Sequence, residues 1–179
     1  SENSGLENSN VASSGIYFSK GATVSPWDLW LISGELEKQI ASFPTSVGGL
    51  IVSKTDHLAQ EDALRINWTQ GDQTRYQPSN EGDYFRISTI EPDDMTRQSN
   101  GAMKLAFNAK SFSGQTETIR IGQCDNQSDC NKTLELEISK NWKEYMISLK
   151  DFENLGIEMS NIISAFLVKA MPGTDIGLS

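Results

Sequence analysis

Apolar and polar residues alternate with a period of two along most of this chain. The segment ALRINW at 63–68 shows the pattern clearly, because its apolar side chains alternate with Arg65 and Asn67. Successive side chains of a β-strand point to opposite faces, so this alternation is typical of a strand with one buried face. We therefore predict a strand here.

The same pattern recurs in short segments, each expected to be a strand: 15–20, 29–33, 48–54, 63–68, 84–89, 102–110, 116–122, 133–138, 143–149, 165–170 and 175–179. Stretches rich in turn residues, such as NEGD and MPGTD, separate them. Segments 34–43 and 149–162 are each expected to hold a helical turn. With no internal repeat and no helix-length amphipathic segment, the chain is predicted to be all-β, an antiparallel β-sandwich of the jelly-roll kind.

Alternation also predicts part of the hydrophobic core. One face of KLAFNA and YMISL carries Met103, Leu105, Phe107, Tyr145, Ile147 and Leu149. We assign these residues to packing and not to function.

Length and charge narrow the classes of protein. The chain has 179 residues, enough for one domain, which we place at 16–179; residues 1–15, rich in Ser, Asn and Gly, are expected to be a flexible tether. A formal charge of −9 and the lack of a basic cluster argue against nucleic-acid binding. No apolar run is long enough to span a membrane, and no signal-peptide core is visible.

The two cysteines, Cys124 and Cys130, lie between two predicted strands, 116–122 and 133–138. Zinc needs four ligands and His57 is the only histidine, so a metal site is disfavoured. We predict a disulfide across the tip of a hairpin, rather than two free thiols. A disulfide implies an oxidising compartment: the periplasm, the cell surface or the outside of the cell.

The sequence does not show the pattern of a catalyst. A Ser–His–Asp triad would have to use His57, and no G-x-S-x-G motif is present. Acidic residues are abundant, but no carboxylate pair stands out as the two groups of a glycosidase. We expect no enzymatic activity of this chain alone.

Aromatic residues favour sugar binding instead, because their flat faces stack on the C–H faces of pyranose rings. Trp27 and Tyr76 lie in expected loops and are the first candidates. Trp30 and Trp68 are reserves, to be used if their strand faces point outward; the alternation around Trp68 favours a place in the core.

Acidic residues at the edges of predicted strands raise two further questions. Glu61 and Asp62 precede Arg65, and we interpret the three as a structural ion-pair motif rather than a sugar contact. Jelly-roll modules can hold a structural calcium ion through carboxylates, and Asp56 and Asp175 are the candidate ligands. No other cofactor is expected.

Several motifs together resemble a known family. The order KGATVSPWDLWL, GGLIV, DHLAQEDALRINW, the cysteine hairpin, WKEYMISLKDFENLGIEMSNI and AFLVKA is similar to the C-terminal module of ExoP-type bacterial exo-β-glucanases of glycoside hydrolase family 3. The resemblance runs from Ile16 onward. It implies a galactose-binding-like jelly roll joined to catalytic domains that carry the nucleophile and the acid/base. It stops just before the module's last strand, which is therefore expected to be truncated or shortened.

Two functions of different classes follow. The chain is either a secreted carbohydrate-binding module that holds a hydrolase on β-glucan, or a structural module that packs on the catalytic domains or supports dimerisation. An exposed row of aromatic side chains would favour the first, and a large continuous apolar patch the second.

Overall fold

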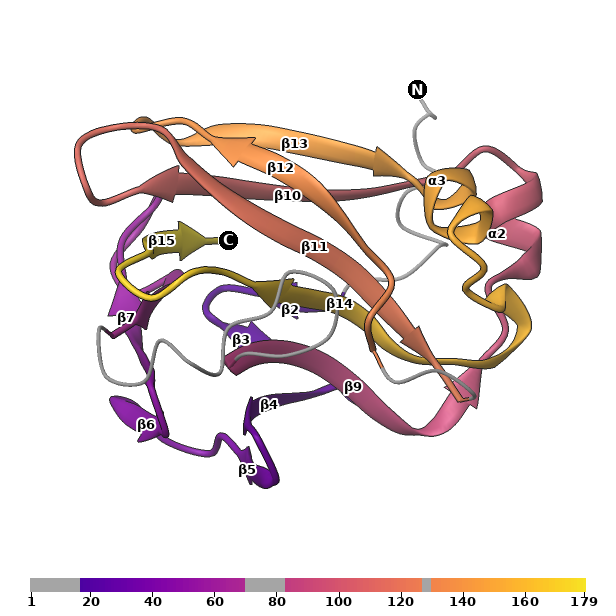
Figure 1. Cartoon of the computed structure of the whole chain (residues 1–179), viewed down its shortest axis with the longest axis horizontal. Coiled ribbons are helices and arrows are strands. Elements are labelled where there is room, and N and C mark those ends of the chain that lie inside the picture. Colours follow the sequence, from indigo (N-terminus) through magenta and orange to yellow (C-terminus); the bar gives the residue numbers. More distant parts are fainter. Residues whose placement is uncertain (1–16, 70–82, 127–129) are drawn as a thin grey trace.

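The computed structural model describes residues 17–69, 83–126 and 130–179, and these form two antiparallel six-stranded sheets packed face to face (Figure 1). The β8 sheet has the strand order β13-β10-β15-β8-β7-β6, and the β9 sheet has the order β12-β11-β14-β9-β4-β5. A short hairpin of β2 and β3 pairs with neither sheet, and its Phe18 packs against the core between them. The predicted all-β sandwich is confirmed.

The strands have the following bounds. The β8 sheet contains β6 (Thr45–Val47), β7 (Leu50–Thr55), β8 (Ala63–Trp68), β10 (Lys104–Ser111), β13 (Lys143–Ser148) and β15 (Asp175–Leu178). The β9 sheet contains β4 (Asp28–Ser33), β5 (Leu36–Gln39), β9 (Asp83–Asp93), β11 (Glu117–Asp125), β12 (Thr133–Ile138) and β14 (Ile162–Lys169). The hairpin is β2 (Phe18–Ser19) and β3 (Ala22–Thr23).

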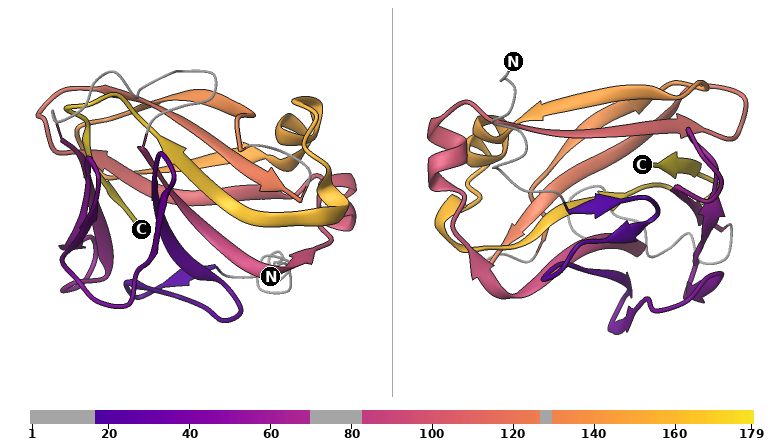
Figure 2. Two further views of the ribbon diagram at one scale, coloured as in Figure 1. Left: turned by 60° about the horizontal axis from the view of Figure 1, so that its bottom comes forward. Right: turned by 180° about the vertical axis from the view of Figure 1, so that it is seen from behind.

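Helical structure is short and lies at one end of the sandwich, as Figure 2 shows from two further directions. The predicted turn in 149–162 is confirmed by α3 (Leu149–Asn154) and η2 (Met159–Asn161), whereas α2 (Thr96–Asn100) was not predicted. The helical turn expected in 34–43 is wrong. This segment folds back on β4 as strand β5, because Gly34 adopts a positive φ and turns the chain into a hairpin.

The core lies between the sheets, where the apolar faces of both meet. The predicted inner residues are confirmed: Leu105, Phe107, Tyr145, Ile147 and Leu149 are buried, and Met103 packs against them while half-buried. Alternate residues of each strand form this inner face, so the residues between them point to the outer face of each sheet, where they can contact solvent or a ligand.

Strand β15 occupies the middle of the β8 sheet. Leu178 is registered with Ala109 of β10 on one side and with Leu64 of β8 on the other. The predicted tether, 1–15, lies outside the described residues. That the module's last strand is shortened stays a prediction.

Candidate functional site

The predicted sugar-binding aromatics do not gather at one place. Trp68 is 2% exposed, and its indole N–H donates to the backbone oxygen of Asp83, so it is a core residue. Trp27 is 8% exposed and packs edge-on against Tyr17. The expectation that Trp27 stands open in a loop is therefore wrong: its turn folds the ring into the core.

The other two candidates differ. Trp30 is half-buried on the outer side of the β9 sheet, in the same row as Arg86, with which it is registered. Tyr76 lies outside the described residues. Trp30 does not stand in an exposed row of aromatic rings among the residues that the structure describes, since it is itself half-buried.

Asp62, an acidic residue of the predicted ion-pair motif, organises the loop that precedes β8. The carboxylate of Asp62 accepts hydrogen bonds from the backbone N–H groups of His57, Leu58 and Ala59, at 2.7–3.0 Å. Desolvation by itself would raise the pKa of Asp62, but these three donors outweigh it and hold the pKa below its usual value. Asp62 thus fixes the loop that presents His57.

Arg65 does not pair with Glu61 or Asp62, and this part of the prediction is wrong. Its guanidinium instead makes a two-pronged hydrogen bond to Asp175 on the neighbouring strand β15, with Nε–Oδ1 at 3.0 Å and Nη2–Oδ2 at 2.6 Å. Register explains the difference: β15 lies beside β8 with Gly177 opposite Arg65, so Asp175, two residues before Gly177, is the diagonal neighbour of Arg65 on the outer side. The hydrogen bond to Asp175 raises the pKa of Arg65.

These contacts bear on the calcium prediction. Arg65 engages both oxygens of Asp175, while Asp56 accepts from the backbone N–H of Glu61 at 2.7 Å. Within the described ranges, no three His, Cys, Asp or Glu side chains gather as a metal site would require. Bound calcium finds no support in these residues.

A glycine leaves room on the outer side of the β8 sheet. A Cβ added to Gly177 would lie 2.8 Å from Cη2 of Trp142 and 3.0 Å from Cε2 of Phe112. Both rings therefore lie close against the backbone of β15. No larger residue fits at this position without moving one of them, so the glycine decides where both rings lie.

Each ring near Gly177 has a partner. The centroids of His57 and Trp142 lie 4.3 Å apart with their planes tilted by 35°. The guanidinium carbon of Arg65 lies 4.2 Å from the centre of the Phe112 ring, close enough for a cation–π contact. We call this surface the Gly177 face, consisting of His57, Arg65, Phe112, Trp142, Asp175 and Gly177.

The Gly177 face brings together residues that are far apart in the sequence, from the loop before β8 to the last strand. Its aromatic members are half-buried, and the side chain of Arg65 is 43% exposed. Ring surfaces beside a fixed guanidinium–carboxylate pair can bind a flat polar ligand by stacking and by hydrogen bonds at once. Of these residues, we predicted Arg65 and Asp175 in other roles and missed Trp142 and Phe112.

A sequence signal for the missed residues exists. The register pairs Asn108 of β10 with Glu144 of β13, both on the outer side, and counting on in steps of two puts Lys110, Phe112 and Trp142 on that same side. Aromatic residues at the outward-facing positions of a predicted strand, or just beyond its ends, are therefore candidates for ligand contact. The first candidates predicted from sequence, Trp27 and Tyr76, lie in expected loops, and the reserves on strands were Trp30 and Trp68.

The outer side of the β9 sheet differs from the Gly177 face, because it carries a disulfide. Cys124 and Cys130 form the predicted disulfide, which packs on Leu167 together with Tyr84 and Ile163 as a second, smaller hydrophobic cluster. This cluster covers part of β14, one of the two central strands of the sheet. The disulfide prediction is confirmed.

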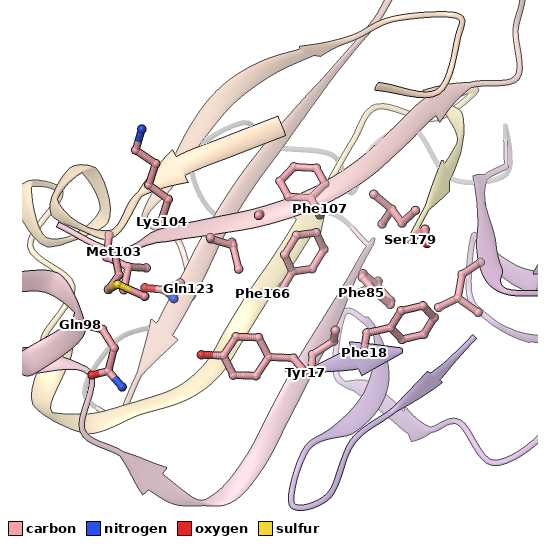
Figure 3. A pocket seen from close by; sticks show the side chains of 16 residues that line it. Tyr17, Phe18, Phe85, Gln98, Met103, Lys104, Phe107, Gln123, Phe166 and Ser179 are labelled. Carbon is pink, nitrogen blue, oxygen red and sulfur yellow. The ribbon is translucent and has the colours of Figure 1, made fainter. Parts of the chain in front are cut away.

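An apolar cavity of about 240 Å³ lies between the sheets (Figure 3). Aromatic rings of Tyr17, Phe85, Phe107 and Phe166 form much of its wall, and Gln98 and Gln123 stand at one end. Burial, with a smaller effect of Asp93, raises the pKa of Tyr17 to about 12. No helix in the described part of the chain is long and apolar enough to cross a membrane.

Comparison with known proteins identifies the fold. The profile of the Exop_C family, described as galactose-binding domain-like, matches residues 25–179. No curated protein sequence matches.

Solved structures with the same fold have low sequence identity. The extra C-terminal domain of the exo-1,3/1,4-β-glucanase ExoP from a Pseudoalteromonas species is 12% identical, with a TM-score of 0.63 over 90% of this chain and 88% of that one. The complete ExoP enzyme matches at a TM-score of 0.62, and the alignment spans 20% of its length.

A family 30 carbohydrate-binding module of a cellulosomal cellulase from Clostridium thermocellum is 15% identical, with a TM-score of 0.51 over 89% of this chain and 91% of that one. At such identities the likeness concerns the fold.

Proposed function

We propose that this chain, which belongs to the Exop_C family of galactose-binding-like domains, is a non-catalytic module that binds β-glucan through its Gly177 face. The observation that carries the proposal is the gathering of Trp142, Phe112 and the Arg65–Asp175 pair around Gly177. The fold is shared with domains whose names say that they bind carbohydrate or belong to a β-glucanase.

The chemistry of the face suits a neutral polysaccharide. A pyranose ring offers C–H groups on its faces and hydroxyls at its rim, so it needs an aromatic surface with donors and acceptors beside it. Trp142 supplies the aromatic surface. Arg65 and Asp175 supply donors and acceptors in one fixed arrangement, because each holds the other.

Such an open face supports modest affinity. A sugar that stacks on one side keeps part of its hydration, and little of its surface is buried. We expect a Kd of roughly 10 µM to 1 mM, or about −4 to −7 kcal/mol.

The proposal also includes the partners and the cellular location of the module. Its partners are β-glucan and the catalytic domains of a family 3 hydrolase, which would carry the catalytic carboxylates. The Cys124–Cys130 disulfide favours a place in the periplasm, on the cell surface or outside the cell. The module itself needs no cofactor for binding by stacking and hydrogen bonds.

Affinity electrophoresis on laminarin, cellulose and mixed-linkage glucan tests the proposal. Trp142→Ala is expected to weaken retention about fivefold or more, since it removes a stacking contact of about 1–3 kcal/mol, the range for stacking on aromatic platforms. Trp30→Ala is the matched control, because Trp30 is a half-buried tryptophan on the other sheet.

The variants separate the alternatives. Loss of binding with Trp30→Ala or Tyr76→Ala, and not with Trp142→Ala, would move the site away from the Gly177 face to the residues predicted from sequence. No retention of the wild-type chain on any β-glucan would reject sugar binding and favour the structural module. Release of nitrophenol from an aryl β-glucoside by the pure chain would contradict the non-catalytic assignment.

A further inference from the structure

A row of side chains crosses the outer side of the β8 sheet through Gly177. Lys110 of β10 and Arg65 of β8 are both registered with Gly177, one from each side. The pairing of β10 with β13, counted on by one residue from Lys143, places Trp142 opposite Lys110 at the end of the same row. A ligand that stacks on Trp142 would therefore lie beside Lys110.

Two cations contact the ring of Phe112. The guanidinium carbon of Arg65 lies 4.2 Å from the ring centre, and Nζ of Lys110 lies 4.9 Å from it. Each cation is attracted by the ring, but two like charges around one ring repel each other. An anion bound beside them would offset this repulsion.

The two cations differ in their counter-charges. Arg65 engages both carboxylate oxygens of Asp175. Lys110 contacts the Phe112 ring but forms no hydrogen bond or ion pair with any residue that the structure describes. Its side chain belongs to a half-buried residue, so the ammonium group gives up part of its hydration without gaining a carboxylate. An anionic partner from outside the chain would compensate for this loss.

Two acidic side chains on neighbouring segments leave Lys110 unpaired. Glu144 is on the same side of the sheet but is registered with Asn108, one row away. Glu117 accepts from the backbone N–H of Asp175 at 3.3 Å. The charge of the whole chain, −9, repels anions at long range, but salt at physiological strength screens such interactions over about 8 Å. The local positive charge therefore acts on a group bound within the face.

We propose that the Gly177 face prefers a glycan that carries an anionic group, a carboxylate or a sulfate ester, and that Lys110 binds this group. The inference rests on the proposed function, since it needs a sugar stacked on Trp142. Arg65 donates to Asp175 through Nε and Nη2, which leaves Nη1 as a further donor. A glycan suits the row better than an acidic peptide, because the aromatic surface of Trp142 adjoins the cation.

Isothermal titration calorimetry at physiological ionic strength tests the preference with three soluble ligands. These are laminarin, laminarin sparsely oxidised at C6 to carboxylates, and sparsely sulfated laminarin. The wild-type chain is expected to bind at least one charged form about fivefold more tightly than laminarin, at the upper end for an exposed ion pair. The two charged forms distinguish a carboxylate ligand from a sulfate ester.

Lysine variants assign the preference to one side chain. Lys110→Met is expected to remove it, because methionine keeps an unbranched side chain on Phe112 and lacks the charge, whereas Lys110→Arg should retain it. Lys104→Met is the matched control. Lys104 is exposed on the same side of β10, about 20 Å away along the strand, and its loss changes the net charge equally. The readout is the ratio of Kd values for neutral and charged laminarin, so an overall change in affinity does not obscure it.

Failure of this inference and failure of the proposed function give different results. Equal affinity of the wild type for all three ligands overturns the inference and leaves β-glucan binding in place. So does a preference that Lys110→Met keeps, or one that Lys104→Met loses equally. No binding of any ligand overturns both.

Two further outcomes concern the identity of the ligand. Binding of the charged laminarins alone would support the inference and narrow the proposed function to charged glucans. Tighter binding of the peptide acetyl-Glu-Glu-Glu-Glu-amide than of either charged laminarin would make Lys110 a contact for a protein and overturn the inference.

Discussion

The two outward faces of this sandwich are built in opposite ways. On the β9 sheet, the disulfide hairpin packs over Leu167 and Tyr84 as a second hydrophobic cluster. On the β8 sheet, the central strand carries Gly177 at the corresponding middle position, and the flanking rings approach its backbone. One face has its middle covered by the disulfide cluster, and the other by two aromatic rings that pack on bare backbone because Gly177 has no side chain.

The two faces are expected to have different roles: the outer face of the β9 sheet contributes to stability, and the Gly177 face contributes to binding. A cluster that buries Cys124 and Leu167 completely contributes to holding the sheet together. The Gly177 face instead uses a buried backbone position to place two rings and an ion pair near solvent. Changes on the first face should therefore reduce stability most, and changes on the second should reduce binding most.

The largest expected effect comes from removing the disulfide. The double variant Cys124→Ser, Cys130→Ser is expected to lower the free energy of unfolding by about 2–4 kcal/mol, since the short cross-link restricts the unfolded chain and both sulfurs are buried. Urea denaturation measures it, with the reduced wild type as control. A variant as stable as the oxidised wild type would show that the hairpin does not hold the β9 sheet.

Adding a side chain at Gly177, beneath the two rings, should have the next largest effect. Gly177→Val is expected to cost about 1–3 kcal/mol of unfolding free energy and to abolish β-glucan binding, because Trp142 or Phe112 must move. Urea denaturation and affinity electrophoresis measure the two effects.

Ser53→Val is the control for Gly177→Val, since Ser53 lies in the same row of the sheet, opposite Arg65. A change within about ±0.5 kcal/mol is expected there. If Gly177→Val is equally mild, the rings are not fixed by the glycine.

The Arg65–Asp175 pair should contribute less to stability. A double-mutant cycle of Arg65→Met and Asp175→Asn is expected to give a coupling energy of about 0.5–1 kcal/mol, because Arg65 remains partly exposed. The same variants should weaken sugar binding more than they lower stability. A coupling near zero with binding unchanged would remove the pair from the proposed site.

The smallest effect is a change with pH in the loop that presents His57. Because the pKa of Asp62 is lowered in the folded chain, its loop contacts are fully formed above the ordinary aspartate pKa and are lost as pH falls through the lowered value.

NMR shifts of the Leu58 and Ala59 amides, followed from about pH 6 to about pH 2, should report this loss. Asp62→Asn is the control and should show no such titration. Amide shifts in the wild type that do not move would show that Asp62 does not organise the loop.

Much of the fold could be predicted from the sequence because strand alternation is a local signal. The segment 63–68 matches β8, and the segment 133–138 matches β12, residue for residue. Segment 34–43 failed because its polar residues form an edge strand, whose pairing with β4 comes from the Gly34 turn and not from burial. Helix α2 was missed because five residues carry too little periodicity.

The sequence by itself determined the class of fold, the inner faces of the strands and the disulfide hairpin, since each depends on residues close together in the chain. Only the tertiary structure decided the partner of Arg65, the burial of Trp27 and the meeting of Trp142 with Gly177. These depend on which strands become neighbours. Asp175 lies 110 residues from Arg65 along the chain, and β15 brings them together by inserting between β10 and β8, a choice that no local pattern encodes.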